Sequence, residues 1–218
     1  MKIYLATGNQ HKKREMQRIF SDFEIVIPKD EGIEFDPDET GSSFFENSVI
    51  KAKALYDIVK APVIADDSGL CVDALCGAPG IYSSRYAGKD AMKGTGVKIA
   101  QEKQNMLLLE QVNEVLEKGE EAKNMPYLNG KRSCHYVCSL TCYVAPDRFF
   151  NVQETFEGYL IDKIEDAAGC GGFGYDPLVL LKEYGKTVAE ISDEEKDAIS
   201  HRGKAARALY EIVKKVSL

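Results

Sequence analysis

The sequence contains no apolar run long enough to cross a bilayer. Its longest runs, such as Leu178 to Leu181, fall far short of the roughly 20 residues that a membrane-spanning helix needs. The start of the chain also lacks the apolar stretch and small-residue cleavage site of a secretory signal. No internal repeat or convincing linker divides the chain. We therefore expect one cytoplasmic domain over residues 1 to 218, with no membrane association.

Basic residues are fewer than acidic residues in this chain. The chain has 28 lysines and arginines against 35 acidic residues, a formal net charge of −7. This balance argues against a surface that coats polyanions, so any nucleic-acid role would depend on a local basic patch. Two short basic groups, His11 to Arg14 and Lys204 to Arg207, keep an RNA- or DNA-binding module open as the least favoured alternative.

Among the six cysteines there is no C-x-x-C pair, which removes the usual spacing of a zinc or redox site. Cys134, Cys138 and Cys142 share parity in a β-rich run, so they lie on one face of a strand, successive ones about 13 Å apart. A disulfide needs Cα atoms within about 7 Å, so these three cannot pair with one another. We interpret them as buried, small apolar residues with reduced thiols.

Hydrophobic periodicity predicts a mixed α/β protein. The chain opens with a strand over residues 2–6, a Thr7-Gly8-Asn9 turn and a helix over 11–20. Ser43 followed by Glu46 predicts a capping box at the start of a second helix that ends near Lys60. Further strands are predicted at 24–27, 63–65, 134–144, 149–156, 158–161 and 177–181, further helices at 97–118, 192–199 and 205–216, and a loop over 119–131.

The first strand–turn–helix unit is suited to binding phosphate. Its turn offers a hydroxyl, a carboxamide and free backbone N–H groups at the positive end of a helix, with Lys12 and Lys13 in the first turn. The alternative is that Asn9 only caps the helix and that the basic residues form a solvated face.

The pair Asp66-Asp67 follows the apolar strand 63–65 and places two carboxylates on opposite sides of the backbone. An inward carboxylate there can hold Mg²⁺ or orient a water; the alternative is a polar turn after a strand. Glu39, in an acidic run, is by default a solvated residue. Glu46 is sufficiently explained as a capping partner, and we do not expect it to bind metal.

Glycines around Phe173 let a backbone loop approach a ligand while the ring offers a face for stacking on a base. The alternative is a core aromatic residue in a tight turn. Near the break between the last two predicted helices, Lys196, His201 and Arg202 together offer several donors to a carbonyl-bearing ring.

Six segments in order closely resemble the inosine triphosphate pyrophosphatase (Ham1-like) family, from residue 3 to about residue 209. They are Thr7-Gly8-Asn9-x-x-Lys12; Glu39-Thr40-Gly41 with Glu46-Asn47-Ser48-x-x-Lys51-Ala52; Ala65-Asp66-Asp67-Ser68-Gly69-Leu70; Pro79-Gly80-Ile81-Tyr82-Ser83-Ser84-Arg85-Tyr86; Gly172-Phe173-Gly174-Tyr175-Asp176-Pro177; and Ser200-His201-Arg202-Gly203. Ser48 where alanine is commoner, a longer segment around 119–132 and the number of cysteines depart from the family, and we expect them to affect only the surface and the dimer contacts.

The resemblance implies an α/β fold with a long mixed central sheet, flanking helices, two lobes around a nucleotide cleft, and a homodimer. It further implies Mg²⁺-dependent hydrolysis of deaminated (non-canonical) purine triphosphates, namely ITP, dITP and XTP, to the monophosphate and pyrophosphate. A non-catalytic nucleotide sensor using the same residues is the alternative, and it predicts binding without turnover.

Carried onto this sequence, the resemblance implies that Glu39 and Asp67 hold Mg²⁺ and that Asp67 accepts the proton of the attacking water. It implies substrate contacts for Thr7, Gly8, Asn9, Gln10, His11, Lys12, Lys51, Ser68, Phe173, Gly174, Tyr175, Asp176, Lys196, His201 and Arg202. The six-position oxygen of hypoxanthine or xanthine would accept from Arg202 or Lys196, whereas the amino group of adenine would leave these donors unpaired, a difference worth about 10⁴ in selectivity. Exclusion of GTP must come from the two position.

Overall fold

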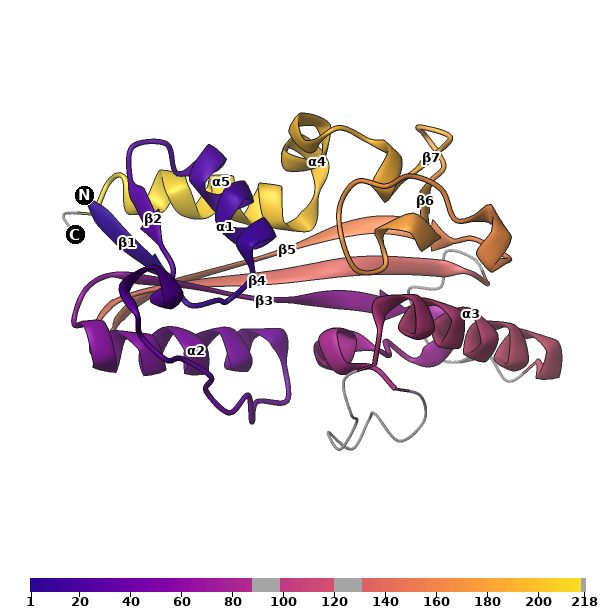
Figure 1. The fold of residues 1–218 in the computed structure, drawn as a ribbon, viewed down its shortest axis with the longest axis horizontal. Helices are drawn as coiled ribbons and strands as arrows, with labels where there is room; N and C mark the ends of the chain where they lie inside the picture. The colour runs from indigo at the N-terminus through magenta and orange to yellow at the C-terminus, as the bar shows by residue number, and fades with distance from the viewer. Residues whose placement is uncertain (88–98, 120–130, 217–218) are drawn as a thin grey trace. The chain divides into compact units, whose positions relative to one another are not determined.

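The computed structural model describes residues 1–87, 99–119 and 131–216. Seven strands form one mixed, open sheet in the order β2-β1-β3-β4-β5-β6-β7, flanked by helices (Figure 1). The strands are β1 (Lys2–Leu5), β2 (Glu24–Val26), β3 (Val63–Val72), β4 (Ser133–Ala145), β5 (Arg148–Leu160), β6 (Val179–Leu181) and β7 (Lys186–Thr187). The helices are α1 (Gln10–Ile19), α2 (Phe44–Val59), α3 (Gln101–Lys118), α4 (Asp193–Ile199) and α5 (His201–Val213). The predicted α/β class with a mixed central sheet is confirmed.

The chain folds into two compact units, each assembled from separate segments. Unit 1 comprises Met1–Ser68, Val137–Glu154 and Asp197–Leu218, and unit 2 comprises Gly69–Tyr136 and Thr155–Lys196. The predicted helix over 97–118 begins at Gln101, and its expected residues 97 and 98 lie outside the described part. The expected loop over 119–131 falls outside it from residue 120 to 130.

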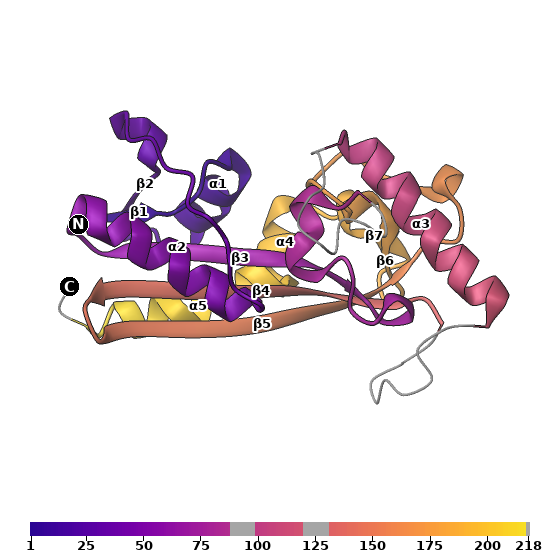
Figure 2. The same cartoon turned by 90° about the horizontal axis from the view of Figure 1, so that it is seen from below.

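Alternation along the strands sorts the core of unit 1 into two layers. Ile3, Leu5 and Ile64 pack with residues of α1 and α5, whereas Tyr4, Val63 and Ala65 pack with residues of α2. Seen from below, α2 lies in front of the strands and α5 behind them (Figure 2). Because side chains point alternately to the two faces, the parity of a strand residue fixes which helices it meets.

The third strand is longer than its sequence suggests. The predicted strand over 63–65 continues through Val72, so Asp66 and Asp67 lie inside the strand and the alternative of a polar turn is wrong. Both carboxylates are buried, and each has a cationic partner in unit 1. Charge pairing is what allows two aspartates in the interior of a sheet, where unpaired carboxylates would be too costly.

Two other boundaries differ from prediction. The strands expected at 149–156 and 158–161 are one strand, β5, which continues through Gly158 and pairs antiparallel with β6 at Tyr159–Leu180 and Leu160–Val179. The last helix starts at His201 rather than Ala205, since the Ser200 hydroxyl caps it by accepting from the Gly203 N–H at 3.1 Å. His201 and Arg202 therefore stand in the first turn of α5.

A buried polar cluster joins α2 to the central strands. The Ser48 hydroxyl lies 2.8 Å from the Thr141 hydroxyl and 3.2 Å from that of Ser139, and the Asn151 amide donates to both partners at 2.8 and 2.9 Å. Ser48 is fully buried, so the expectation that this departure from the family affects the surface is wrong. By parity, Ser139 and Thr141 face α2, on the side opposite Cys138 and Cys142.

All six cysteines are free, and Cys134, Cys138 and Cys142 are buried as predicted. Cys71, Cys134, Cys138 and Cys142 are buried, and only Cys76 and Cys170 are exposed. Burial raises the pKa of Cys71 and of Cys142 to about 12 and that of Cys138 well above its ordinary value. The four buried thiols therefore resist ionisation. In the same described part of the chain, no helix is long and apolar enough to span a membrane.

Thiol titration checks this arrangement. With Ellman's reagent at pH 8 and no denaturant, we expect Cys76 and Cys170 to react quickly and the four buried thiols to react only on unfolding, because the thiolate is the reactive form. In guanidinium chloride without reductant, all six should react. Replacing both exposed cysteines with serine should remove the fast phase. Any thiol that still reacts quickly in this variant would contradict the assignment of the other four as buried.

Candidate active site

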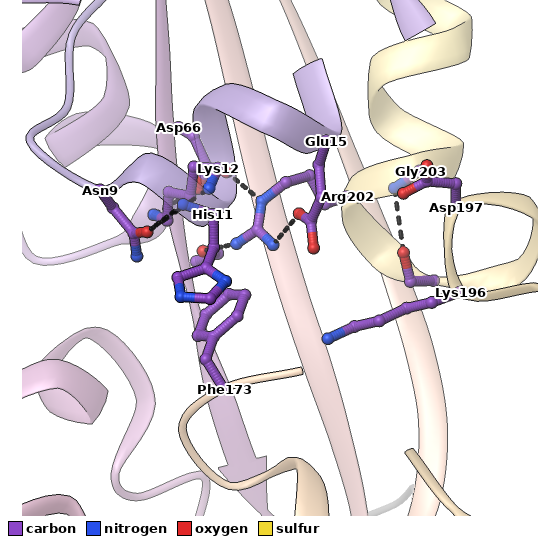
Figure 3. Close-up of polar contacts among 12 residues, drawn as sticks. Asn9, His11, Lys12, Glu15, Asp66, Phe173, Lys196, Asp197, Arg202 and Gly203 are labelled. Carbon is purple, nitrogen blue, oxygen red and sulfur yellow. Dashed lines mark hydrogen bonds and ion pairs between the residues drawn. The ribbon is translucent and has the colours of Figure 1, made fainter. Parts of the chain in front are cut away.

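Asp66 lies on the face of unit 1 that carries α1 and α5. Its Oδ1 accepts from the Lys12 ammonium at 2.9 Å and its Oδ2 from the Arg202 guanidinium (Figure 3). Burial alone would raise the pKa of Asp66, but Arg202 and Lys12 together hold it far below its ordinary value. Asp66 is therefore an ionised structural anchor for two cations rather than a proton acceptor.

Arg202 is fully buried and spans three partners within unit 1. Besides Asp66, its guanidinium donates to Glu15 at 2.7 Å (Figure 3) and to the Ser68 hydroxyl at 2.8 Å. Neighbouring carboxylates keep the pKa of Arg202 well above its ordinary value in spite of burial. This network links the start of α5 to α1 and β3. The role of Arg202 toward a base stays a prediction, as do those of Ser68 and the buried His201.

Asp67 has the opposite parity and faces α2. Its Oδ1 accepts from the Lys51 ammonium at 2.5 Å, and the same ammonium donates to Glu39 at 3.2 Å. Glu39 and Asp67, which are 28 positions apart in the sequence, thus meet at a single cation. Burial raises the pKa of Asp67, and Lys51 offsets this only in part. Asp67 and Glu39 keep Lys51 charged, raising its pKa despite its burial.

Asn47 connects the segment that carries Glu39 to this cluster. Its Oδ1 accepts from the Gly41 N–H at 2.9 Å, and its Nδ2 lies 3.5 Å from Asp67. Glu46, one position earlier, accepts from the Ser42 N–H and hydroxyl at 2.6 and 2.7 Å. Glu46 is therefore a capping residue, as predicted.

The Thr-Gly-Asn turn is ordered by its own side chains. Asn9 Oδ1 accepts from the His11 N–H at 2.8 Å and from the Lys12 N–H at 3.4 Å, so Asn9 is the N-cap of α1. The Thr7 hydroxyl accepts from the Asn9 N–H at 3.1 Å. Gly8, Gln10 and His11 are exposed. The cap named in the alternative interpretation is therefore present, and phosphate binding at this turn stays a prediction.

Unit 2 holds the second group of predicted residues. Asp176 Oδ2 accepts from the Phe173 N–H at 2.7 Å and from the Lys196 ammonium at 2.5 Å. Figure 3 shows the Lys196 chain extending toward the Phe173 ring, and its Nζ lies 4.9 Å from the ring centroid. Gly172 and Gly174 take positive φ on either side of Phe173, and Tyr175 is buried with its hydroxyl donating to the Ser83 carbonyl at 3.0 Å.

Three residues in these contacts have no role in the sequence analysis. Glu15 stands one helical turn after Lys12, a spacing that places both on one face of α1. Asn47 sits inside a segment that carries the resemblance. Tyr136, which donates to Asp176 Oδ1 at 3.0 Å, shares strand parity with the buried cysteines but gives no other signal.

The donor set is compatible with one divalent cation that keeps several water or phosphate ligands. Mg²⁺ is usually held by one or two carboxylates together with substrate phosphates, and Glu39 and Asp67 supply two carboxylates in contact with one ammonium. Within residues 1–87, 99–119 and 131–216, no group of three or more histidine, cysteine, aspartate or glutamate side chains forms a metal cage. These residues therefore fit magnesium better than zinc.

Comparison with known proteins identifies the family. The chain is 49% identical over 214 residues to the dITP/XTP pyrophosphatase of Treponema denticola, covering 98% of this chain and 99% of that protein. It is 39% identical to the dITP/XTP pyrophosphatase of Escherichia coli strain K12, covering 98% of each. A solved HAM1 protein from Coxiella burnetii superposes with a TM-score of 0.80 at 30% identity, over 99% of this chain and 100% of that one. The Staphylococcus aureus Ham1 protein gives 0.75 at 32%, over 99% of each. The Ham1 family model matches residues 3–212, and the chain therefore belongs to the Ham1 family.

Proposed function

We propose that this protein is a Mg²⁺-dependent nucleoside triphosphate pyrophosphatase that hydrolyses ITP, dITP and XTP to the monophosphate and pyrophosphate. The observation that carries the proposal is the cluster in which Glu39 and Asp67 meet at the Lys51 ammonium. Relatives that share almost the whole chain length and bear the name dITP/XTP pyrophosphatase support it. A homodimer and a cytoplasmic location remain predictions from the family resemblance.

Unit 1 supplies the chemistry for the triphosphate end. A nucleoside triphosphate brings about four negative charges, so a chain of net charge −7 needs concentrated local cations to bind it. Lys12 donates one N–H to Asp66, and Lys51 donates one each to Asp67 and Glu39, so each three-donor ammonium has at least one further N–H for a phosphate oxygen. The N-terminus of α1 adds backbone N–H groups and a partial positive charge.

Asp67 is the proposed proton acceptor for the attacking water. Lys51 holds Oδ1 of this carboxylate at 2.5 Å and so orients the group. Bound by Glu39 and Asp67, Mg²⁺ would supply charge neutralisation on the polyphosphate. Asp66 cannot substitute, because Arg202 and Lys12 stabilise its charged form. Adjacent aspartates thus receive different tasks from opposite faces of one strand.

Unit 2 supplies the chemistry for the purine end. The Phe173 ring is half-buried and offers a stacking surface, and the Lys196 ammonium at its face is a donor for a base oxygen. Hypoxanthine and xanthine carry that acceptor at the six position, whereas adenine places an amino group there. Adenine would leave a buried donor unpaired, which is the costly outcome in recognition by hydrogen bonds.

A substrate panel with pyrophosphate detection tests the proposal directly. We expect rapid pyrophosphate release from ITP, dITP and XTP, at least about 10²-fold slower release from ATP, and loss of all release in excess EDTA that is restored by Mg²⁺. ITP binding without turnover would instead support the sensor alternative. Turnover of ATP as fast as ITP would contradict recognition of deaminated purines.

Replacing Asp67 with asparagine tests its role. We expect kcat for ITP to fall by about 10²- to 10⁴-fold, since the amide keeps the shape but cannot accept the proton. The circular dichroism spectrum should match that of the parent protein, because Lys51 retains Glu39 as a partner. Parental turnover in this variant would remove Asp67 from catalysis.

The adjacent variant Asp66→Asn separates folding from catalysis. Because Asp66 is buried and compensates Arg202 and Lys12, we expect its loss to lower the free energy of unfolding by about 3–5 kcal/mol. Urea denaturation measures this effect. Unchanged stability would mean that Glu15 alone compensates the buried guanidinium.

A further inference from the structure

Asp176 is the centre of a buried polar cluster in unit 2. Only 3% of Asp176 is exposed, and three donors converge on its carboxylate. The Phe173 N–H and the Lys196 ammonium share Oδ2, at 2.7 and 2.5 Å, and the Tyr136 hydroxyl donates to Oδ1, at 3.0 Å. Phe173 and Lys196 belong to the proposed purine site, whereas Tyr136 lies on β4, far from either in sequence.

We propose that Tyr136 is a positioning residue for purine recognition, acting through Asp176. The inference rests on the proposed function and names a determinant of its base selectivity. The χ2 angle of an aspartate has broad energy wells, so contacts decide how the carboxylate is oriented. A hydrogen bond that holds one oxygen also sets the direction of the other. By holding Oδ1, the Tyr136 hydroxyl directs Oδ2 at the Phe173 N–H and at Lys196.

The tyrosine itself has little freedom. Its ring stacks on Phe156, with centroids 6.5 Å apart and planes 21° apart, and the residue is 6% exposed. Burial and the neighbouring Asp176 raise the pKa of Tyr136 well above its ordinary value, so the hydroxyl keeps its proton and remains a donor to the carboxylate.

The backbone at Gly172 lies so close to the Asp176 carboxylate that it excludes other orientations of this carboxylate. A Cβ at Gly172 would lie 2.1 Å from Asp176 Oδ2 and 3.1 Å from Lys196 Nζ. The loop therefore fits against the carboxylate only while the carboxylate keeps its orientation. Lys196, held by the same oxygen, stands 4.9 Å from the Phe173 ring centroid, so the stacking ring and the base donor share one support.

The test is Tyr136→Phe, which keeps the ring and removes the hydroxyl. We expect KM for ITP to rise by about threefold to thirtyfold, kcat to stay within about twofold, and the selectivity for ITP over ATP to fall. Inhibition by inorganic tripolyphosphate, which has no base, should not change. In an Asp176→Asn background the same substitution should have a smaller effect, because the pair acts as one unit.

Tyr143→Phe is the matched control, since Tyr143 is a buried tyrosine on the same strand that packs with the rings of Tyr56 and Phe149. This control should leave KM, kcat and selectivity at parental values. An unchanged KM for ITP in Tyr136→Phe, or weaker tripolyphosphate inhibition in parallel, would overturn the inference while the parent enzyme still turns over.

If the parent protein released no pyrophosphate from ITP, the proposed function would fail. The same two variants would then be compared by calorimetric titration with ITP. Weaker binding in Tyr136→Phe alone would support the positioning role, and equal binding in the parent and both variants would overturn it.

Discussion

The site in unit 1 depends on the burial of two adjacent carboxylates in the middle of one strand. A lone buried carboxylate would shed its charge, so a strand with Asp66 and Asp67 in its interior needs a cation on each face. Lys12 and Arg202 serve one face and Lys51 the other. The helices that deliver these cations are thereby tied to β3, and the positions of α1, α2 and α5 follow from charge compensation as well as from apolar packing.

The two faces differ in electrostatic character. On the Asp66 side, two cations outweigh burial, and the carboxylate is locked in its charged form. On the Asp67 side, the Lys51 ammonium is shared with Glu39, and burial raises the pKa of Asp67 by more than this cation lowers it. Environment rather than residue type therefore gives the two neighbouring carboxyl groups pKa shifts of opposite direction. The short Glu39–Lys51–Asp67 cluster is suited to exchange of partners, whereas the Arg202 network, with Glu15 and Ser68 added, is suited to rigidity.

Periodicity and capping signals in the sequence predicted most elements of the fold. The β1–α1 unit and the Ser43 cap of α2 depend on local spacing, and each appears where expected. The continuation of β3 through Asp66 and Asp67 could not be predicted locally, because it depends on cations from helices distant in sequence. The six motif segments indicated most candidate residues. Tyr136 and Glu15 were not among them, since each acquires its partner only in the folded chain.

The buried polar cluster that joins α2 to the central strands constrains which amino-acid substitutions this part of the chain can accept. Ser48, Ser139, Thr141 and Asn151 satisfy one another in the interior, so the helix is held at one register by directional bonds rather than by interchangeable methyl groups. An alanine at position 48 alone would remove one hydroxyl partner from both Ser139 and Thr141. We therefore expect homologues that differ at one of these four positions to differ at the others as well, so that substitutions in this cluster occur together.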